Sequence, residues 1–250
     1  MSNAKKKPIC YFYQRSFSNY NLELFKKVQD NPNINIKYFF DKDPSSLSDE
    51  LDCEVTKSLI LFASKNLSQI RYEVYLSYKF IFRVVKHKPD IIVSEDGGNI
   101  INNLVLIFLK KFINFKLIFW GLGSIRNRRQ SWIRRFAQYL IELTWRQSDH
   151  IFAYSNFGLN VYQSSGIEIT KITNITNALP GSYSEWENFI ESREKNLPKE
   201  PINLVFVGRL IKTKKVDLLL EALAFLDGSA KRAKSKFQLL IVGDGPASKE

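Results

Sequence analysis

Short, almost wholly apolar runs recur through residues 1–180, and a longer amphipathic stretch separates each from the next. Such runs are typical of strands buried on both faces of a parallel sheet. Their alternation with helices predicts a doubly wound α/β domain. The predicted strands are 9–13, 34–40, 90–93, 116–120, 150–154 and 171–175. The predicted helices are 19–30, 67–87, 99–112, 125–147 and 156–165, with a loop and a short helix in 45–65.

The alternation stops and then restarts near the end of the chain. Residues 181–201 are polar and charged, and the flanking prolines Pro180 and Pro201 favour a linker. A strand at 202–208, a helix at 214–226 and a strand at 237–243 follow. We therefore expect a Rossmann-like domain at 1–180, a linker at 181–201 and the opening of a second Rossmann-like domain at 202–250. A strand–helix–strand unit cannot bury both faces of its sheet, so we expect a longer protein or another surface that covers it.

The charge balance narrows the class of partner. Lys and Arg number 37 and Asp and Glu 25, which gives a net charge of +12 and predicts an anionic partner: nucleic acid, anionic lipid or a phosphorylated ligand. Two Cys and two His exclude a disulfide framework and a His-rich metal site, and a reducing cytoplasm is the simplest setting. The longest charge-free apolar run, 97–109, is shorter than the ~20 residues of a membrane span. Attachment to the inner membrane face stays open.

Two glycine-containing turns follow the strands predicted after residue 201. Gly208 ends the first strand, Arg209 follows, and Lys214 stands five residues later at a helix start. Ligands of open α/β sheets bind beyond the carboxyl ends of the strands, where Arg can bind two phosphate oxygens and Lys adds a point charge. The spacing predicts a pyrophosphate clamp, and two solvated cations near a turn are the alternative. The second turn, Gly243-Asp244-Gly245, allows close approach of a ligand or is simply a turn.

The segment GRLIKTKKVDLLLEAL, followed by LLIVGDGP, resembles the second-domain opening of group 1 (family 4) retaining glycosyltransferases of the GT-B fold. KPDIIVSED, KLIFWGLG, SDHIFAYSNFGLNVYQSSGI and KITNITNAL are similar to successive first-domain segments of that family. The resemblance implies two Rossmann-like domains across a cleft, with a nucleotide-sugar donor of UDP or GDP type on the second. It implies transfer, with retention, to a hydroxyl of a glycan or lipid-linked saccharide bound on the first.

The resemblance also assigns roles on the donor side. Arg209 and Lys214 would bind the donor diphosphate and help the nucleotide leave, so that neither a metal nor another cofactor is needed. The donor-binding set would be Gly208, Arg209, Lys214, Gly243, Asp244 and Gly245.

Three departures from the family pattern stand out. Leu122 occupies the place of a histidine that many relatives use at the reacting sugar, so that proton-transfer role is absent or elsewhere. The family's paired-glutamate motif does not occur in these 250 residues, so we expect this chain alone not to transfer sugar. Lys215 replaces a common glycine.

Acceptor-side candidates follow the first-domain strands. Ser18 and Asn19 would touch a ligand in the cleft or simply cap a helix. Glu95 and Asp96 would bind acceptor hydroxyls or act as a base, or start a turn. The acceptor-side set is Ser18, Asn19, Glu95, Asp96, Gly121 and Gly123.

Residues 97–148 contain nine Lys or Arg and one acidic residue, Glu142. A helical wheel places Trp132, Phe136 and Ile141 on a core-facing side, with the arginines opposite. The basic side is either a solvated face or a site for an anionic membrane. Nucleic acid is disfavoured because no recognition motif or stacking platform is present. A non-catalytic module that binds anionic lipid or glycan is the alternative function. The membrane-surface candidates are Lys110, Lys111, Arg128, Arg129, Arg134 and Arg135.

Overall fold

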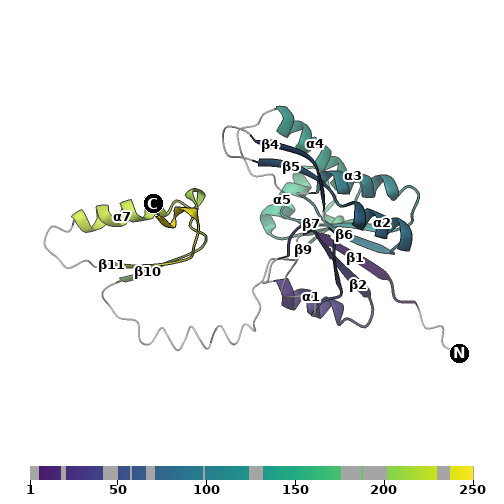
Figure 1. The fold of residues 1–250 in the computed structure, drawn as a ribbon, viewed down its shortest axis with the longest axis horizontal. Helices are drawn as coiled ribbons and strands as arrows, with labels where there is room; N and C mark the ends of the chain where they lie inside the picture. The colour runs from purple at the N-terminus through teal and green to yellow at the C-terminus, as the bar shows by residue number, and fades with distance from the viewer. Residues whose placement is uncertain are drawn as a thin grey trace. The chain divides into compact units, whose positions relative to one another are not determined.

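The computed structural model describes residues 6–17, 21–41, 50–56, 58–65, 71–97, 99–123, 132–175, 187, 202–229 and 237–249. The chain divides into two compact units, Met1–Pro180 and Gly181–Glu250 (Figure 1).

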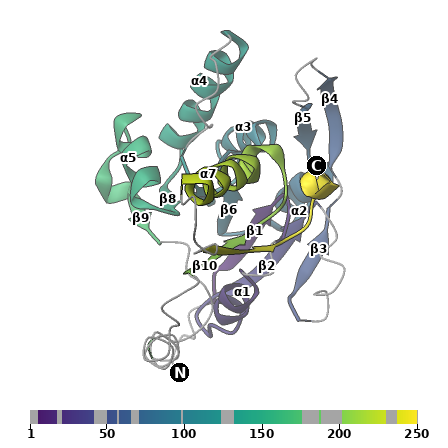
Figure 2. The same ribbon diagram turned by 90° about the vertical axis from the view of Figure 1, so that its left-hand side faces the viewer.

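A seven-stranded parallel sheet forms the centre of the first unit, in the order β3-β2-β1-β6-β7-β8-β9 (Figure 2). The strand order reverses between β1 and β6, which confirms the predicted doubly wound topology. The strands are β1 Ile9–Gln14, β2 Asn35–Phe40, β3 Cys53–Val55, β6 Ile91–Glu95, β7 Lys116–Gly121, β8 His150–Ala153 and β9 Ile172–Asn174.

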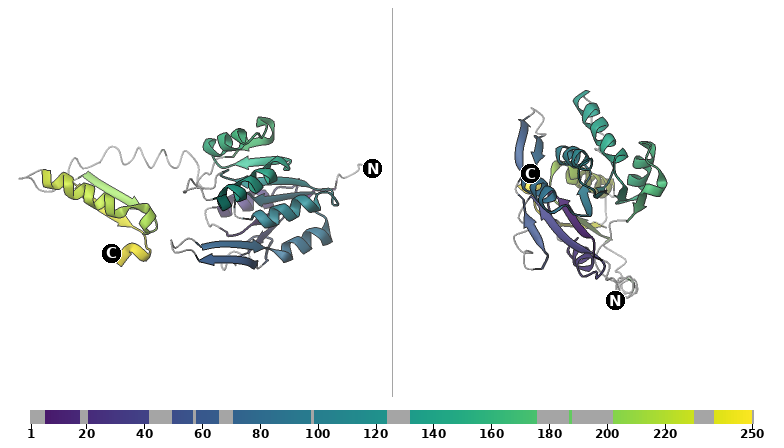
Figure 3. Two further views of the ribbon diagram at one scale, coloured as in Figure 1. Left: turned by 90° about the horizontal axis from the view of Figure 1, so that it is seen from above. Right: turned by 90° about the vertical axis from the view of Figure 1, so that its right-hand side faces the viewer.

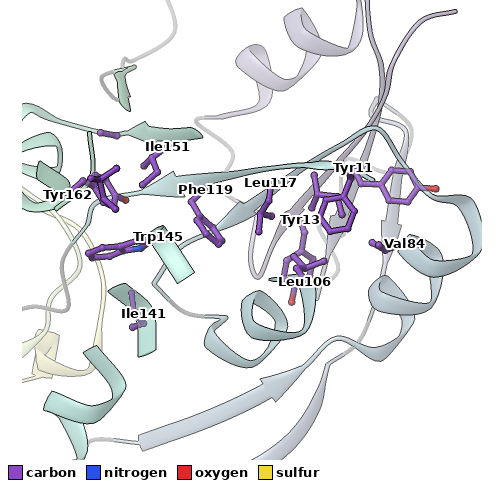
Figure 4. Close-up of a cluster of buried hydrophobic side chains, with 14 of the residues drawn as sticks. Tyr11, Tyr13, Val84, Leu106, Leu117, Phe119, Ile141, Trp145, Ile151 and Tyr162 are labelled. Carbon is purple, nitrogen blue, oxygen red and sulfur yellow. The ribbon is translucent and has the colours of Figure 1, made fainter. Parts of the chain in front are cut away.

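Helices cover both faces of this sheet because successive strand residues point to opposite sides. Tyr11 and Tyr13 of β1 lie in one buried cluster, which Figure 4 shows, and Cys10 and Phe12 lie in the other. The first cluster includes residues of four helices: α2 (Tyr78–His87), α3 (Ile100–Leu109), α4 (Trp132–Arg146) and α5 (Asn156–Ser164). The second cluster includes Phe25 of α1 (Leu22–Gln29). A short 3₁₀ turn, η2 (Ile169–Lys171), precedes β9.

The prediction was wrong for most of the described residues between 50 and 77. The structure has β3 in place of a short helix, and β4 (Leu59–Lys65) pairs antiparallel with β5 (Arg71–Leu76). Figure 3 shows this hairpin, in blue, as a separate two-stranded ribbon. Of the predicted helix 67–87, residues 71–76 form β5 and the helix α2 begins at Tyr78, while residues 67–70 lie outside the described residues. The sequence RYEVYL is rich in aromatic and β-branched residues, and its pairing with β4 outweighs the helical periodicity.

The second unit confirms the predicted strand–helix–strand order. Parallel strands β10 (Ile202–Val207) and β11 (Phe237–Val242) flank the turn η3 (Lys212–Lys214) and the helix α7 (Val216–Ser229), and η4 (Pro246–Lys249) follows. Leu204, Phe206 and Leu239 are half-buried, whereas alternate residues such as Val207 are exposed. One face of this small sheet is therefore exposed in the part of the unit that the structure describes. Of the predicted linker 181–201, only Glu187 lies among the described residues.

Within the described part of the chain, no helix combines the length and the apolar character needed to cross a bilayer.

Candidate functional site

The first candidate site lies where the sheet of the first unit reverses its strand order. β1 ends at Gln14 and β6 ends at Glu95. The backbone N–H of Arg15 donates to Glu95 Oε2 across 3.2 Å, so the ends of the two strands are tied together. Glu95 itself is half-buried. In open α/β sheets this position, beyond the carboxyl ends at a reversal of strand order, is where ligands bind.

Asp96 is the buried centre of this edge, only 6% exposed. Its Oδ2 accepts a hydrogen bond from the Tyr162 hydroxyl at 2.5 Å and another from the Gly123 N–H at 3.2 Å. Burial raises the pKa of Asp96 to about 6, although these two donors act to lower it. Asp96 therefore faces α5 and the loop 121–123, and its contacts are those of a residue that positions that loop. Binding of an acceptor by Asp96 stays a prediction.

Three glycines allow the loop to fit between Asp96 and α5. A Cβ on Gly121 would collide with the Asp96 carboxylate, and one on Gly158 would lie 2.9 Å from the Leu122 carbonyl oxygen. Gly123 has φ +70°, a left-handed conformation that favours glycine. The Ser155 hydroxyl caps α5 by accepting from the Gly158 N–H. Leu122 is thus fixed at its backbone while its side chain is 53% exposed.

A buried polar network lies behind the edge. Ser94 Oγ donates to Asn103 Oδ1 at 2.7 Å, and Asn103 Nδ2 donates to the Glu95 carbonyl at 3.0 Å. Asn102 Nδ2 donates to the Tyr13 hydroxyl at 3.0 Å. The network ties α3 to β1 and β6. The sequence analysis missed it, although two adjacent asparagines in an otherwise apolar helix were a signal, because buried polar groups need partners.

Three buried polar side chains at the same strand ends have atoms without hydrogen-bond partners among the described residues. They are Gln14 at the end of β1, Asn99 directly before α3, and Trp120 on β7. Asn99 is 1% exposed, and neither its Oδ1 nor its Nδ2 has a hydrogen-bond partner among the described residues. A buried polar group without a partner loses about 1–3 kcal/mol, so this edge has hydrogen-bonding capacity to offer a polar ligand.

The second candidate site is the carboxyl end of β10 and β11. The two turns there are joined by their backbones: Gly208 N–H donates to Val242 O at 3.0 Å and Leu210 N–H to Asp244 O at 2.9 Å. A Cβ on Gly243 would collide with the Gly208 carbonyl, and one on Gly245 with the Leu210 carbonyl. The close packing of one turn on the other therefore explains why these two positions are glycine, whether or not a ligand binds there.

Arg209 and Lys214 lie in the connection from β10 to α7. Arg209 directly follows Gly208, Lys214 ends the turn η3, and both are exposed. Within the described ranges, neither side chain forms an ion pair. Asp244 Oδ1 accepts from the Gly245 N–H at 2.7 Å, which uses that carboxylate within its own turn. The two cations are therefore available to an anion. Lys215, where the resemblance has glycine, adopts a left-handed conformation with φ 57°.

The basic residues of 97–148 do not form one uniform surface. Lys110 lies 2.5 Å from Asp149 and Lys116 3.1 Å from it. Burial acts to raise the pKa of Asp149, but these lysines and the Leu117 N–H outweigh it and hold the pKa below its ordinary value. Lys110 is therefore engaged in an ion pair, whereas Lys111 and Arg135 are exposed.

The positions of several predicted site residues are not given by the structure. Ser18, Asn19, Arg128 and Arg129 lie outside the described residues, and the side chain of Arg134 is not described.

The predicted core side of α4 was wrong for two of its aromatic residues. Trp132 is 77% exposed and Phe136 58% exposed, whereas Ile141 and Trp145 are buried. The helix is oriented by its C-terminal half, where the Trp145 ring packs edge-on against the Tyr162 ring at 4.8 Å (Figure 4).

Residues 188–250 match the family model described as "Glycosyl transferases group 1". The chain is also 28% identical, over 206 residues, to the "Uncharacterized 41.2 kDa protein in cps region" of Klebsiella pneumoniae. That alignment covers 80% of this chain and 54% of the relative, so the chain spans about half the relative's length.

Solved structures share the architecture at low sequence identity. The lipopolysaccharide outer core galactosyltransferase WaaB is 19% identical with a TM-score of 0.55, over 96% of this chain and 62% of that one. Anabaena Alr3699/HepE in complex with UDP is 15% identical with a TM-score of 0.58, over 95% and 61%. The UDP-N-acetylglucosamine 2-epimerase of Rickettsia bellii is 11% identical with a TM-score of 0.55, over 97% and 63%. The chain therefore has a GT-B type α/β fold, which transferases and epimerases share.

Proposed function

We propose that the protein of which this chain forms part transfers a sugar from a UDP- or GDP-sugar to a hydroxyl of a glycan or lipid-linked saccharide, with retention. The observation that carries this is the pair Arg209 and Lys214, exposed at the carboxyl end of β10. Both lie inside the segment that matches group 1 glycosyl transferases. Support for the donor class is that Anabaena HepE, of the same fold, was crystallised with UDP and with UDP-glucose.

The proposed role of the second unit is to neutralise the negative charge of the donor diphosphate. In the transfer, the bond between the sugar's anomeric carbon and the diphosphate oxygen breaks, and a bond forms from that carbon to the acceptor hydroxyl oxygen. Negative charge therefore builds on the departing nucleoside diphosphate. The Arg209 guanidinium can donate to two of its oxygens, and the Lys214 ammonium adds a point charge beside them. Cations placed where charge develops in the transition state lower the barrier. Because these two side chains supply that charge, the proposed reaction uses no metal or other cofactor.

The first unit is proposed to bind the acceptor. Glu95 is half-buried where β1 and β6 meet, and the amide atoms of Asn99, nearby in the sequence, have no hydrogen-bond partner among the described residues. Leu122, in the loop 121–123, has an exposed apolar side chain that cannot donate or accept a proton. Proton transfer at the acceptor hydroxyl therefore does not come from residue 122. Asp96 and Tyr162 act through that loop, as positioning residues. Polysaccharide synthesis is the setting we propose, since the Klebsiella relative is described as lying in a "cps region".

The 250 residues by themselves are not proposed to complete the reaction. The outer face of β10 and β11 is exposed, with Val207 at 74%. The resemblance also requires a paired-glutamate segment to hold the donor sugar, and none occurs in this sequence. A site that lacks groups for the sugar supplies only part of the transition-state contacts.

The test uses the full-length protein with a panel of UDP- and GDP-sugars and a membrane extract as acceptor. Labelled sugar should appear in the extract, and nuclear magnetic resonance should show the donor's anomeric configuration in the product. Arg209→Ala and Lys214→Ala should each lower turnover by roughly 10–100-fold, from ~1.5–3 kcal/mol of charge-assisted hydrogen bonding. Lys212→Ala, which removes an equal charge from the same turn, is the control. Transfer that is unaffected by either variant would contradict the proposal.

A second candidate is sugar epimerisation, which the likeness to UDP-N-acetylglucosamine 2-epimerases favours. The same panel separates the two reactions. A nucleotide sugar inverted at one ring carbon, without acceptor and without release of free nucleotide, would identify an epimerase.

A further inference from the structure

The outer face of α4 carries three exposed aromatic side chains in one stripe. Trp132 is 77% exposed, Phe136 58% and Tyr139 54%. Their spacing of four and then three residues places them above one another on one side of the helix. Singly exposed apolar residues are ordinary, but a contiguous aromatic stripe marks an interaction surface.

The aromatic stripe lies on the side of α4 opposite to the side that packs in the core. The buried residues of α4 are Ile141 at 3%, Thr144 at 1% and Trp145 at 2% exposed. Trp132 and Ile141 were expected on one broad apolar side, but nine residues at ~100° each put them about 180° apart, so they point in opposite directions. The helix therefore has one apolar side that packs on the rest of the first unit and a second apolar side that is exposed.

Cations accompany the aromatic side chains. Arg135 lies between Trp132 and Phe136 in the sequence and is exposed, and Lys111 is exposed just beyond α3, which packs against α4. Phe108, near the end of α3, and Phe112, in the turn after that helix, are 57% and 72% exposed, with ring centroids 5.1 Å apart. Glu142, the sole acidic residue of 97–148, lies 4.0 Å from Arg146. The surface thus combines aromatic rings with excess positive charge.

We propose that this aromatic face of α4, comprising Trp132, Phe136 and Tyr139, docks the protein on an anionic membrane. Trp and Tyr favour the boundary between headgroups and acyl chains, because one end of each ring is apolar and the other polar. The neighbouring Arg135 and Lys111 then lie at the level of the anionic headgroups. The docking is independent of glycosyl transfer, since a chain can bind a bilayer without any turnover.

Charge favours a membrane over a second copy of the chain. With a net charge of +12, two copies that met through this face would bring their cations together, whereas an anionic bilayer attracts them. The composition also differs from the uncovered sheet face of the second unit, where Val205, Val207, Leu240 and Val242 are aliphatic. Such a face resembles half of a protein core, whereas aromatic rings beside Arg and Lys are typical of an interfacial helix.

The experiment is co-sedimentation of the chain with vesicles of phosphatidylcholine, with and without phosphatidylglycerol. The wild type should bind only the anionic vesicles, and added salt should weaken the binding. The triple variant Trp132→Ala, Phe136→Ala, Tyr139→Ala should bind at least tenfold more weakly. The matched comparison is Phe136→Ala with Phe157→Ala, since Phe157 is 65% exposed but lies on α5 and not on α4. Phe136→Ala should weaken binding, and Phe157→Ala should leave it unchanged.

Three outcomes would overturn the proposal. The wild type fails to bind anionic vesicles, the triple variant binds them as well as the wild type does, or the two single variants behave alike. Light scattering after gel filtration tests the competing occupant. A dimer of the wild type that the triple variant loses would make the stripe a contact between copies of the chain. Circular dichroism of the triple variant shows whether it folds, as expected for substitutions at exposed positions.

Discussion

The two candidate sites lie at equivalent places, each at the carboxyl edge of a parallel sheet. They differ in the sign of their charged residues and in how far those residues are buried. In the first unit the central charge is Asp96, which is buried and already bonded to Tyr162 and Gly123. In the second unit the charges are Arg209 and Lys214, which are exposed and form no ion pair with other described residues. A charge that is satisfied internally fixes the shape of a site, whereas an unpaired exposed charge is free to bind a ligand. The first edge is therefore organised for positioning and the second for an anion.

Gly121→Ala should give the largest effect on stability at the first edge. The new Cβ collides with the Asp96 carboxylate, so the buried pair of Asp96 and Tyr162 must shift. Overpacking of this kind costs about 1–3 kcal/mol, and the lost hydrogen bonds add to that, so we expect a loss of about 3 kcal/mol. The measurement is the free energy of unfolding in urea.

Gly97→Ala is the matched control, because a Cβ there has nothing within 4 Å. It should change the free energy of unfolding by well under 1 kcal/mol. Equal losses in the two variants would mean that the collision with Asp96 does not determine the stability of this edge.

Asp96→Asn should change how stability depends on pH. The pKa of Asp96 is about 6 in the folded chain and about 3.9 when unfolded. Between these values the folded state holds the proton and the unfolded state has lost it, so wild-type stability falls as the pH rises from about 4 to 6. Asn cannot ionise and lacks this decline. The stability of the variant relative to the wild type should therefore rise by up to about 3 kcal/mol from pH 4 to pH 7.

Urea unfolding at several pH values measures this difference, and other titrating groups cancel because both proteins contain them. Parallel pH profiles of the two proteins would contradict the burial of an ionisable Asp96.

Lys215→Gly should have the smallest effect on the free energy of unfolding, and it should raise stability whereas Gly121→Ala lowers it. Lys215 has φ 57° at the end of η3, a conformation that glycine adopts without strain. Relief of that strain should stabilise the second unit by about 1 kcal/mol. Lys88→Gly tests the same physics in the first unit, where Lys88 has φ 47° after α2. Thermal unfolding of both variants measures the gain, and a loss in both would refute the argument from left-handed strain.

The sequence was sufficient to predict six of the seven parallel strands of the first unit, because runs buried on both faces are apolar throughout. It missed β3, which has only three residues, all half-buried. It was also sufficient to place Arg209 and Lys214 in the connection from β10 to α7, since these lie within a few residues of each other. It did not identify the partner of Asp96, because Tyr162 is 66 residues away and no local pattern records that contact.

The orientation of α4 shows a second reason for failure. The helix has apolar residues on both sides, so a helical wheel cannot decide which side is buried. That choice depends on packing with distant elements, such as the contact of Trp145 with Tyr162. The hairpin of β4 and β5 was missed for a related reason, since the pairing of residues 59–65 with 71–76 overrides local helical periodicity.

The most direct test of the contrast between the two edges is calorimetry of UDP and GDP binding to the chain and to four variants. Arg209→Ala and Lys214→Ala should each weaken binding by roughly 10–100-fold, the equivalent of ~1.5–3 kcal/mol. Lys212→Ala in the same turn should leave the affinity within about threefold of the wild type, since one exposed charge outside the proposed clamp contributes little. Asp96→Asn should do the same, since Asp96 is buried and bonded within the first unit. Unchanged affinity in Arg209→Ala and Lys214→Ala, or an equal loss in Lys212→Ala, would show that the second edge is not a diphosphate clamp.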